Sequence, residues 1–123
     1  MLYTKSILKS KSSRDGLRVS VMSRHTLNDG KTQDTRITID SYDKWLKELA
    51  PPDRLVRDYY SCKLNWNEYS KKYLSFLRQE EVSSKVKELA KEALEKDITL
   101  LCIEEIPNFC HRRILAEECQ RYK

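Results

Sequence analysis

Hydrophobic and polar residues follow two different rhythms along this chain, and the rhythms separate predicted strands from predicted helices. The run at 98–103 is short, continuous and apolar, which is typical of a strand buried on both faces. The loosely alternating segment 2–8 and the β-branched segment 17–22 predict two more strands, and 36–40 predicts a weak one. Residues 23–35 form a long polar stretch, and a loop of that length is often functional.

Apolar residues in the middle of the chain recur at helical spacing. The segment 42–49 carries apolar residues one turn apart, so it predicts a helix that Ser41 caps and Pro51 and Pro52 end. Asp53 is expected to cap a short helix that reaches Tyr60.

Two further helices follow with clear starting signals or a clear apolar stripe. Asn65 and Glu68 form the spacing of a capping box, which predicts a helix from residue 66. The segment 82–95 has an amphipathic stripe that predicts a third long helix. Asn108 is expected to cap the last helix, whose inward-facing residues would be Phe109, Leu115 and Cys119.

Early strands, central helices and a late buried strand followed by a helix indicate an α/β layer fold. We therefore expect residues 1–123 to form one small domain, with a short and mostly parallel central sheet flanked by helices. No apolar run approaches the roughly 20 residues of a membrane span, and residues 1–5 lack the features of a signal peptide. A cytoplasmic protein without a membrane partner is expected.

The composition of the chain favours some classes of ligand and excludes others. The formal net charge is +5, from 24 basic and 19 acidic residues, which favours anionic partners although the charges are spread along the chain. The only two glycines, Gly16 and Gly30, exclude a Walker loop and a GxGxxG dinucleotide motif. No cofactor is predicted, and any phosphate must bind without a glycine-rich cradle.

Candidate functional residues follow the ends of two predicted strands. Ser23, Arg24 and His25 come after 17–22. Glu104, then Cys110-His111-Arg112, come after 98–103, and the second group falls at the predicted start of the last helix. Because ligands of open α/β sheets bind at the carboxyl ends of parallel strands, these side chains would meet in one cleft if the two strands were neighbours.

Each residue in the Cys-His-Arg turn allows a functional and a structural interpretation. The helix N-terminus, His111 and Arg112 would favour the thiolate form of Cys110, a candidate nucleophile that is otherwise a small packing residue. His111 is a candidate acid–base or phosphate donor, or a partner of Glu104. Arg112 and Arg113 are about 100° apart on a helix, so one is expected to face a ligand, and we favour Arg112. Glu104 is a candidate base, a hydroxyl acceptor or an ion-pair partner.

The cysteines also raise metal and redox alternatives. Cys102, Cys110, His111 and His25 could supply four zinc ligands, but no pair has a recognised metal spacing, so no metal is predicted. Cys102 and Cys110 flank one predicted turn, so a disulfide between them remains a third, redox interpretation.

The same segments resemble the family called domain of unknown function 488 (DUF488). Its C-terminal signature is similar to Thr99-Leu100-Leu101-Cys102-Ile103-Glu104 followed by Cys110-His111-Arg112. The stretches 42–51 and 66–74 resemble the YeaO-like branch, whereas residues 22–26 depart from the Arg-Leu-Trp-Pro-Arg-Gly-like segment of that branch. The resemblance implies an α/β fold and does not supply a reaction.

Taken together, the sequence predicts an anion-binding protein. The expected ligand bears phosphate, such as a nucleotide or a nucleic-acid end, and Ser23, Arg24, His25 and Arg112 would bind it. Cys110, His111 and Glu104 would supply any hydrolase or transferase activity. The alternative is a non-enzymatic binding module in which the Cys-His-Arg turn is structural. The oligomeric state is left open.

Overall fold

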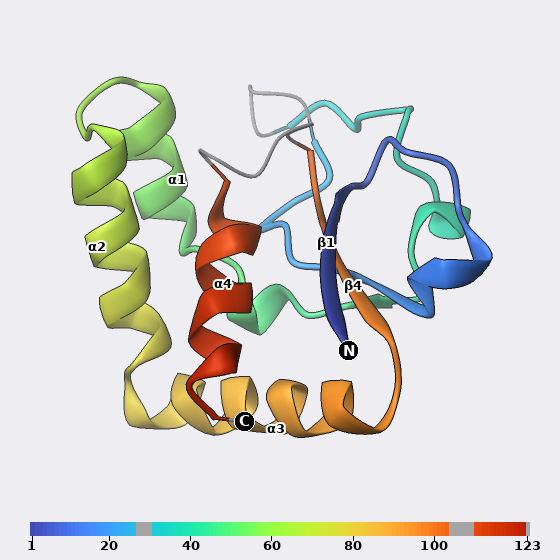
Figure 1. The fold of residues 1–123 in the computed structure, drawn as a ribbon. Coiled ribbons are helices and arrows are strands. Elements are labelled where there is room, and N and C mark those ends of the chain that lie inside the picture. Colours follow the sequence, from blue (N-terminus) through green and yellow to red (C-terminus); the bar gives the residue numbers. More distant parts are fainter. Residues whose placement is uncertain (27–30, 104–109, 123) are drawn as a thin grey trace.

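The central feature of the computed structural model is a parallel sheet of four strands (Figure 1). The structure describes residues 1–26, 31–103 and 110–122. The strands lie in the order β1, β4, β2, β3, and their bounds are Leu2–Ser6, Ile98–Cys102, Leu17–Ser20 and Lys44–Trp45. Each neighbouring pair is parallel, so the predicted α/β fold with a parallel sheet is confirmed.

The apolar strand β4 occupies the middle of the sheet. All five of its residues are buried, as its continuous apolar sequence predicted. It pairs with β1 from Leu2↔Ile98 onward and with β2 from Leu17↔Ile98 onward. The carboxyl ends of β2 and β4 are therefore adjacent at one edge of the sheet, which was the condition for a shared cleft.

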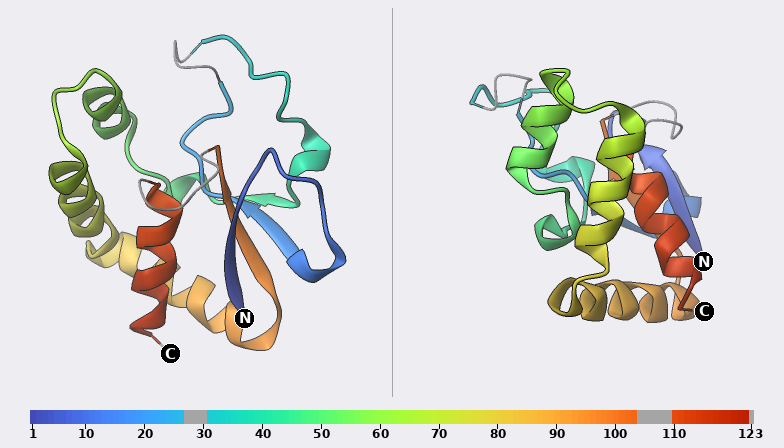
Figure 2. Two further views of the ribbon diagram at one scale, coloured as in Figure 1. Left: turned by 45° about the horizontal axis from the view of Figure 1, so that its top comes forward. Right: turned by 90° about the vertical axis from the view of Figure 1, so that its left-hand side faces the viewer.

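Four α-helices among the described residues build the rest of the domain (Figures 1 and 2). They are α1 (Asp53–Tyr60), α2 (Trp66–Leu77), α3 (Glu80–Glu95) and α4 (His111–Gln120). The right-hand view of Figure 2 shows α2 between α1 and α4, with α3 crossing the lower ends of α2 and α4. The main core lies between β4 and the helices, where Leu100, Leu115, Tyr73 and Val86 are fully buried. No described helix combines the length and the apolar composition that a membrane span requires.

Local sequence signals account for the start of α2. Asn65 Oδ1 accepts the backbone N–H of Glu68 at 2.8 Å, and the Glu68 side chain accepts the backbone N–H of Asn65 at 3.4 Å. The predicted capping box is thus confirmed, because both of its hydrogen bonds lie within one turn of the chain. In α3 most of the predicted apolar stripe is also buried, although Val82 is only partly buried and Leu94 is exposed.

Two predictions for residues 36–49 are wrong. The predicted strand 36–40 is replaced by a short 3-10 helix, Ile39–Ser41, which the Thr38 hydroxyl caps. The predicted helix 42–49 contains instead the edge strand β3 and a 3-10 turn at Lys47–Leu49. Pairing with β2 overrides the helical spacing, because the backbone N–H of Leu46 donates to the carbonyl of Ser20 at 2.9 Å.

Two predicted helix caps are also displaced. Pro52, not Asp53, is the cap of α1, and Asp53 is its first residue. Cys110 is the N-cap of α4, so it is not the second helical residue. Asn108 and Phe109 lie outside the described residues. Leu115 and Cys119 are buried as expected.

Candidate functional site

A cleft of about 780 Å³ opens at the carboxyl ends of the strands. Its walls come from the chain after β2, the end of β4, the start of α4, and α1 with the segment that follows it. This is the edge at which open α/β sheets bind ligands. Of the predicted ligand-binding residues, Ser23 and Arg24 line the cleft.

The cleft wall carries an excess of positive charge. Among the described residues, five basic side chains and two acidic ones line it; the basic ones are Arg24, Arg36, Arg54, Arg57 and Lys63, and the acidic ones are Asp34 and Asp58. Arg36 is committed to Asp34, with Nη2 2.8 Å from Oδ2, and these hydrogen bonds hold the pKa of Asp34 below its usual value. Arg24 Nε lies 4.0 Å from Asp53 Oδ1.

Three of these cations come from α1 and the segment after it. Arg54 and Arg57 are three residues apart, so they share one face of the helix, and Lys63 follows it. All three side chains are exposed, and within the described part of the chain no carboxylate forms an ion pair with them. They are therefore available to a negatively charged ligand.

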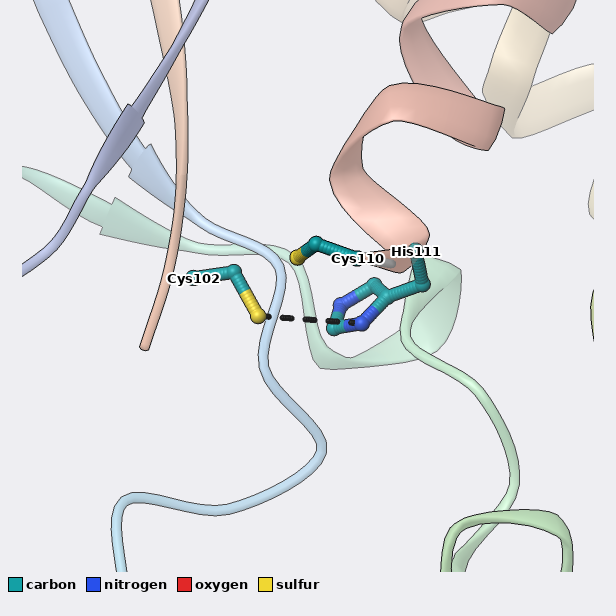
Figure 3. Close-up of side chains that lie close together, drawn as sticks. All are labelled: Cys102, Cys110 and His111. Carbon is teal, nitrogen blue, oxygen red and sulfur yellow. Dashed lines mark hydrogen bonds between the residues drawn. The ribbon is translucent and has the colours of Figure 1, made fainter. Parts of the chain in front are cut away.

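A thiol and an imidazole form part of the cleft wall at the end of β4. Cys102 Sγ lies 3.7 Å from His111 Nδ1, and both residues line the cleft (Figure 3). On the far side of the ring, His111 Nε2 lies 2.6 Å from the backbone carbonyl oxygen of Val21. A carbonyl oxygen only accepts hydrogen bonds, so Nε2 carries a proton and donates it to Val21. The Nδ1 atom is left facing the sulfur.

Aromatic packing holds the His111 ring in this orientation. The ring of Tyr73 meets it edge to face, with centroids 5.6 Å apart and planes at 88°. Tyr73 is itself fixed, because its hydroxyl donates to the carbonyl of Leu49 at 2.6 Å. Burial raises the pKa of Tyr73 well above its usual value, so the phenol stays neutral and keeps this hydrogen bond.

Cys110 and Arg112 lie behind this pair. Both residues are 1% exposed, and neither is among the described residues that line the cleft. Arg112 Nη1 lies 3.5 Å from the carbonyl oxygen of Cys102 and 3.7 Å from Cys110 Sγ. The next residue, Arg113, is partly exposed and pairs with Glu117 at 3.1 Å. The two arginines thus diverge as expected, and Arg112 is directed into the protein.

His25 belongs to an aromatic cluster outside the cleft wall. Its Nε2 lies 2.7 Å from the Ser20 hydroxyl, and its ring stacks on Trp45 with centroids 4.0 Å apart. Burial lowers the pKa of His25, which favours the neutral ring. Its expected role as a ligand-binding residue stays a prediction. Glu104, the remaining catalytic candidate, lies outside the described residues.

Three potential metal ligands also come together here. The Sγ atoms of Cys102 and Cys110 and a ring nitrogen of His111 all lie within 4.8 Å of one another. Three of the four residues considered for zinc therefore cluster. No disulfide joins any of the four cysteines.

Sequence reasoning missed Cys102 as a nucleophile candidate and missed the cations of α1. The available signal for Cys102 was its position near the end of the apolar run 98–103, two residues before Glu104. For Arg54, Arg57 and Lys63 the signal was three cations within ten residues. Local sequence does not determine that these residues lie near the ends of β2 and β4, because that position depends on how the elements pack together.

Fold and site together define a small parallel α/β protein with a thiol–imidazole pair beside a cationic cleft. Over residues 2–123 the chain matches a family model described as the active DUF488-N3 subclade. The chain therefore belongs to the DUF488 family, as the resemblance in its sequence implied. Comparison with curated proteins and with solved structures gives no match.

Proposed function

We propose that the protein binds a phosphate-bearing anion, such as a nucleotide or a nucleic-acid end, in the cleft at the ends of β2 and β4. The observation that carries this proposal is the excess of basic side chains on the cleft wall, of which Arg54, Arg57 and Lys63 have no carboxylate partner among the described residues. Guanidinium groups match phosphate oxygens in charge and in hydrogen-bonding geometry.

The size of the cleft supports a small ligand. A volume of about 780 Å³ lies within the usual range of roughly 300–1,000 Å³ for small-molecule sites. Tyr60, whose side chain is exposed, contributes aromatic surface to the same wall, and bases stack on such rings in nucleotide-binding proteins. Phosphate charge and an aromatic base are both features of a nucleotide, so this ligand class fits the wall best.

A hydrolase or transferase activity is the second part of the proposal. The pair of Cys102 and His111 on the cleft wall supports it, because a thiol within reach of an oriented imidazole is a common nucleophile arrangement. The description of the matching family model as active also supports it. The competing function is a binding module without catalysis, and the burial of Cys110 and Arg112 favours that alternative.

Titration calorimetry with inorganic phosphate and with mononucleotides tests the binding proposal. We expect saturable binding that weakens as salt is raised, because exposed charges are screened. Arg57→Gln and Arg54→Gln should each weaken binding about tenfold, equivalent to about 1.4 kcal/mol. Arg14→Gln is the matched control, because this substitution removes the same charge from an exposed residue that does not line the cleft. Equal losses in all three variants would mean that only net charge matters, and would contradict a built site.

A further inference from the structure

We propose that Cys102 is the nucleophile of a phosphoryl-transfer reaction and that His111 is its acid–base partner. This proposal rests on the proposed function, because it takes the phosphate-bearing ligand of the cleft as its substrate. The substrate class is a phosphomonoester, and water or an alcohol is the acceptor.

The hydrogen-bond pattern around His111 assigns the proton that the reaction needs. Because Nε2 donates to the fixed carbonyl of Val21, the lone pair of a neutral ring sits on Nδ1. Nδ1 is the atom that faces Cys102 Sγ, at 3.7 Å. The ring can therefore take the thiol proton and return it without turning over. The Val21 carbonyl has the orienting role that a carboxylate or amide has in other nucleophile–histidine pairs.

Position relative to the cleft, not exposure, selects Cys102 over Cys110, because both residues are buried, Cys102 at 3% and Cys110 at 1%. Cys102 and His111 both contribute to the cleft wall, whereas Cys110 is not among the described residues that do. Figure 3 shows the two groups arriving from different elements, the thiol from the end of β4 and the ring from the first turn of α4. The nucleophile, the proton acceptor and the cations of α1 thus face one space.

The reactive state of the pair follows from the contact between the two side chains. Transfer of the thiol proton to Nδ1, which faces Cys102 Sγ at 3.7 Å, gives Cys102 as thiolate and His111 as imidazolium. Arg112 supports the backbone of this pair, because its Nη1 lies 3.5 Å from the carbonyl oxygen of Cys102.

The reaction divides into two balanced steps. In the first, Cys102 Sγ attacks phosphorus, an S–P bond forms, the P–O bond to the alcohol breaks, and His111 gives its Nδ1 proton to the departing oxygen. In the second, His111 takes a proton from water, the resulting hydroxide attacks phosphorus, and the S–P bond breaks. The products are an alcohol and inorganic phosphate, and the thiolate and imidazolium are restored. No oxidant, reductant or metal is needed.

The first test measures how fast iodoacetamide alkylates each cysteine of the protein at neutral pH, by peptide mass spectrometry. We expect Cys102 to react at least tenfold faster than the exposed Cys62, and inorganic phosphate to slow it. His111→Gln should remove the excess rate, because glutamine keeps a donor for Val21 and offers no base. A native Cys102 that reacts no faster than the buried Cys119 overturns the proposal.

The second test traps the intermediate with p-nitrophenyl phosphate and an acid quench. We expect the mass of one phosphoryl group on the peptide that contains Cys102, and its loss in Cys102→Ser. Cys62→Ser is the control that should keep the adduct. An adduct on Cys110, or unchanged turnover in Cys102→Ser, overturns the assignment. So does stoichiometric zinc in the purified protein, because the clustered Cys102, Cys110 and His111 would then be metal ligands.

The two proposals fail differently. If calorimetry detects phosphate binding in the cleft and Cys102 is inert, the binding function stands and the nucleophile is overturned. If Cys102 is hyper-reactive but phosphate neither binds in the cleft nor slows the alkylation of Cys102, the proposed binding function is wrong. The proposed phosphomonoester substrate is then wrong as well.

Discussion

His111 Nε2 and the backbone carbonyl of Val21 are joined by a 2.6 Å hydrogen bond that ties the first residue of α4 to the chain just after β2. These residues are 90 positions apart in sequence. The bond therefore has two roles, because it orients the imidazole and it also holds the end of β2 against α4.

We predict that His111→Phe destabilises the fold more than His111→Gln does. Phenylalanine leaves the buried carbonyl of Val21 without its donor, which costs about 1–3 kcal/mol. Glutamine can still donate to that carbonyl, so it should lose less. Urea unfolding followed by circular dichroism measures both values. Equal stability of the two variants would contradict a structural contribution from this hydrogen bond.

Elements with a strong local signal were predictable from sequence. Strand β4 is recognisable because its continuous apolar run is a signal that lies wholly within the strand. The start of α2 is recognisable because Asn65 and Glu68 exchange hydrogen bonds within one turn. The segment 42–49 was not predictable in the same way. Trp45 packs against His25 and donates from its indole to the carbonyl of Met22 at 2.6 Å, so its environment depends on residues about twenty positions away.

The sequence could place the candidate site at two strand ends, but it could not predict which of the candidate residues line the cleft. The two strand ends do lie side by side, and Ser23, Arg24 and His111 do reach the cleft. The predicted nucleophile was Cys110, but α4 begins later than expected, with Cys110 as its cap. Cys110 and Arg112 are buried and are not among the described residues that line the cleft, whereas Cys102 is.

His25 should make the stability of the protein depend on pH. Burial lowers its folded-state pKa below the ordinary value of 6.5, so the unfolded chain takes up the proton first as the pH falls. Stability should therefore be full above about pH 7 and decline as the pH drops through 6.5 towards the folded-state pKa. Comparing wild type with His25→Gln between pH 8 and 5 isolates this residue, because His111 is present in both. The variant should show a shallower decline, and parallel curves would contradict the prediction.

A buried carboxylate couples α2 to α4. Glu118 is 2% exposed and accepts hydrogen bonds from Arg78 at 3.0 Å and from Arg121 at 2.9 Å. Burial alone would raise the pKa of Glu118, but the two guanidiniums outweigh it and the pKa falls below its ordinary 4.5. The stability that this carboxylate contributes is present above pH 4.5 and is lost as the pH falls through the lowered pKa.

We predict that removing both arginines costs more than neutralising the acid. Arg78→Ala with Arg121→Ala strands a buried negative charge, and we expect a loss of about 3 kcal/mol, the lower end for a broken buried pair because both arginines are half exposed. Glu118→Gln should cost about 1 kcal/mol, because the arginines are then solvated and the amide still accepts. Urea unfolding at pH 7 compares them, and the reverse order would contradict this account.

Cys119 should be unreactive in the folded protein. Burial, with a smaller effect from the neighbouring Glu118, raises the pKa of the Cys119 thiol to about 12. At pH 8 almost none of it is thiolate, which is the reactive form. We expect iodoacetamide to label exposed Cys62 at pH 8 in the native protein and to label Cys119 only in urea. Native labelling of Cys119 at the rate of Cys62 would contradict its position in the core.

Gly16 should not tolerate a side chain. It has φ 62° and ψ −132°, a backbone conformation that is essentially restricted to glycine, and a Cβ there would overlap the backbone carbonyl of Asp97. The same carbonyl accepts the N–H of Leu17 at 2.9 Å. The chain at Gly16 and the chain at Asp97 therefore cannot move apart without breaking this hydrogen bond, which joins the start of β2 to the start of β4. We expect Gly16→Ala to cost at least about 2 kcal/mol in urea unfolding. Ser13→Ala, an exposed neighbour, should stay within about 0.5 kcal/mol of wild type, and equal stability of both variants would mean that this turn does not hold the strands in register.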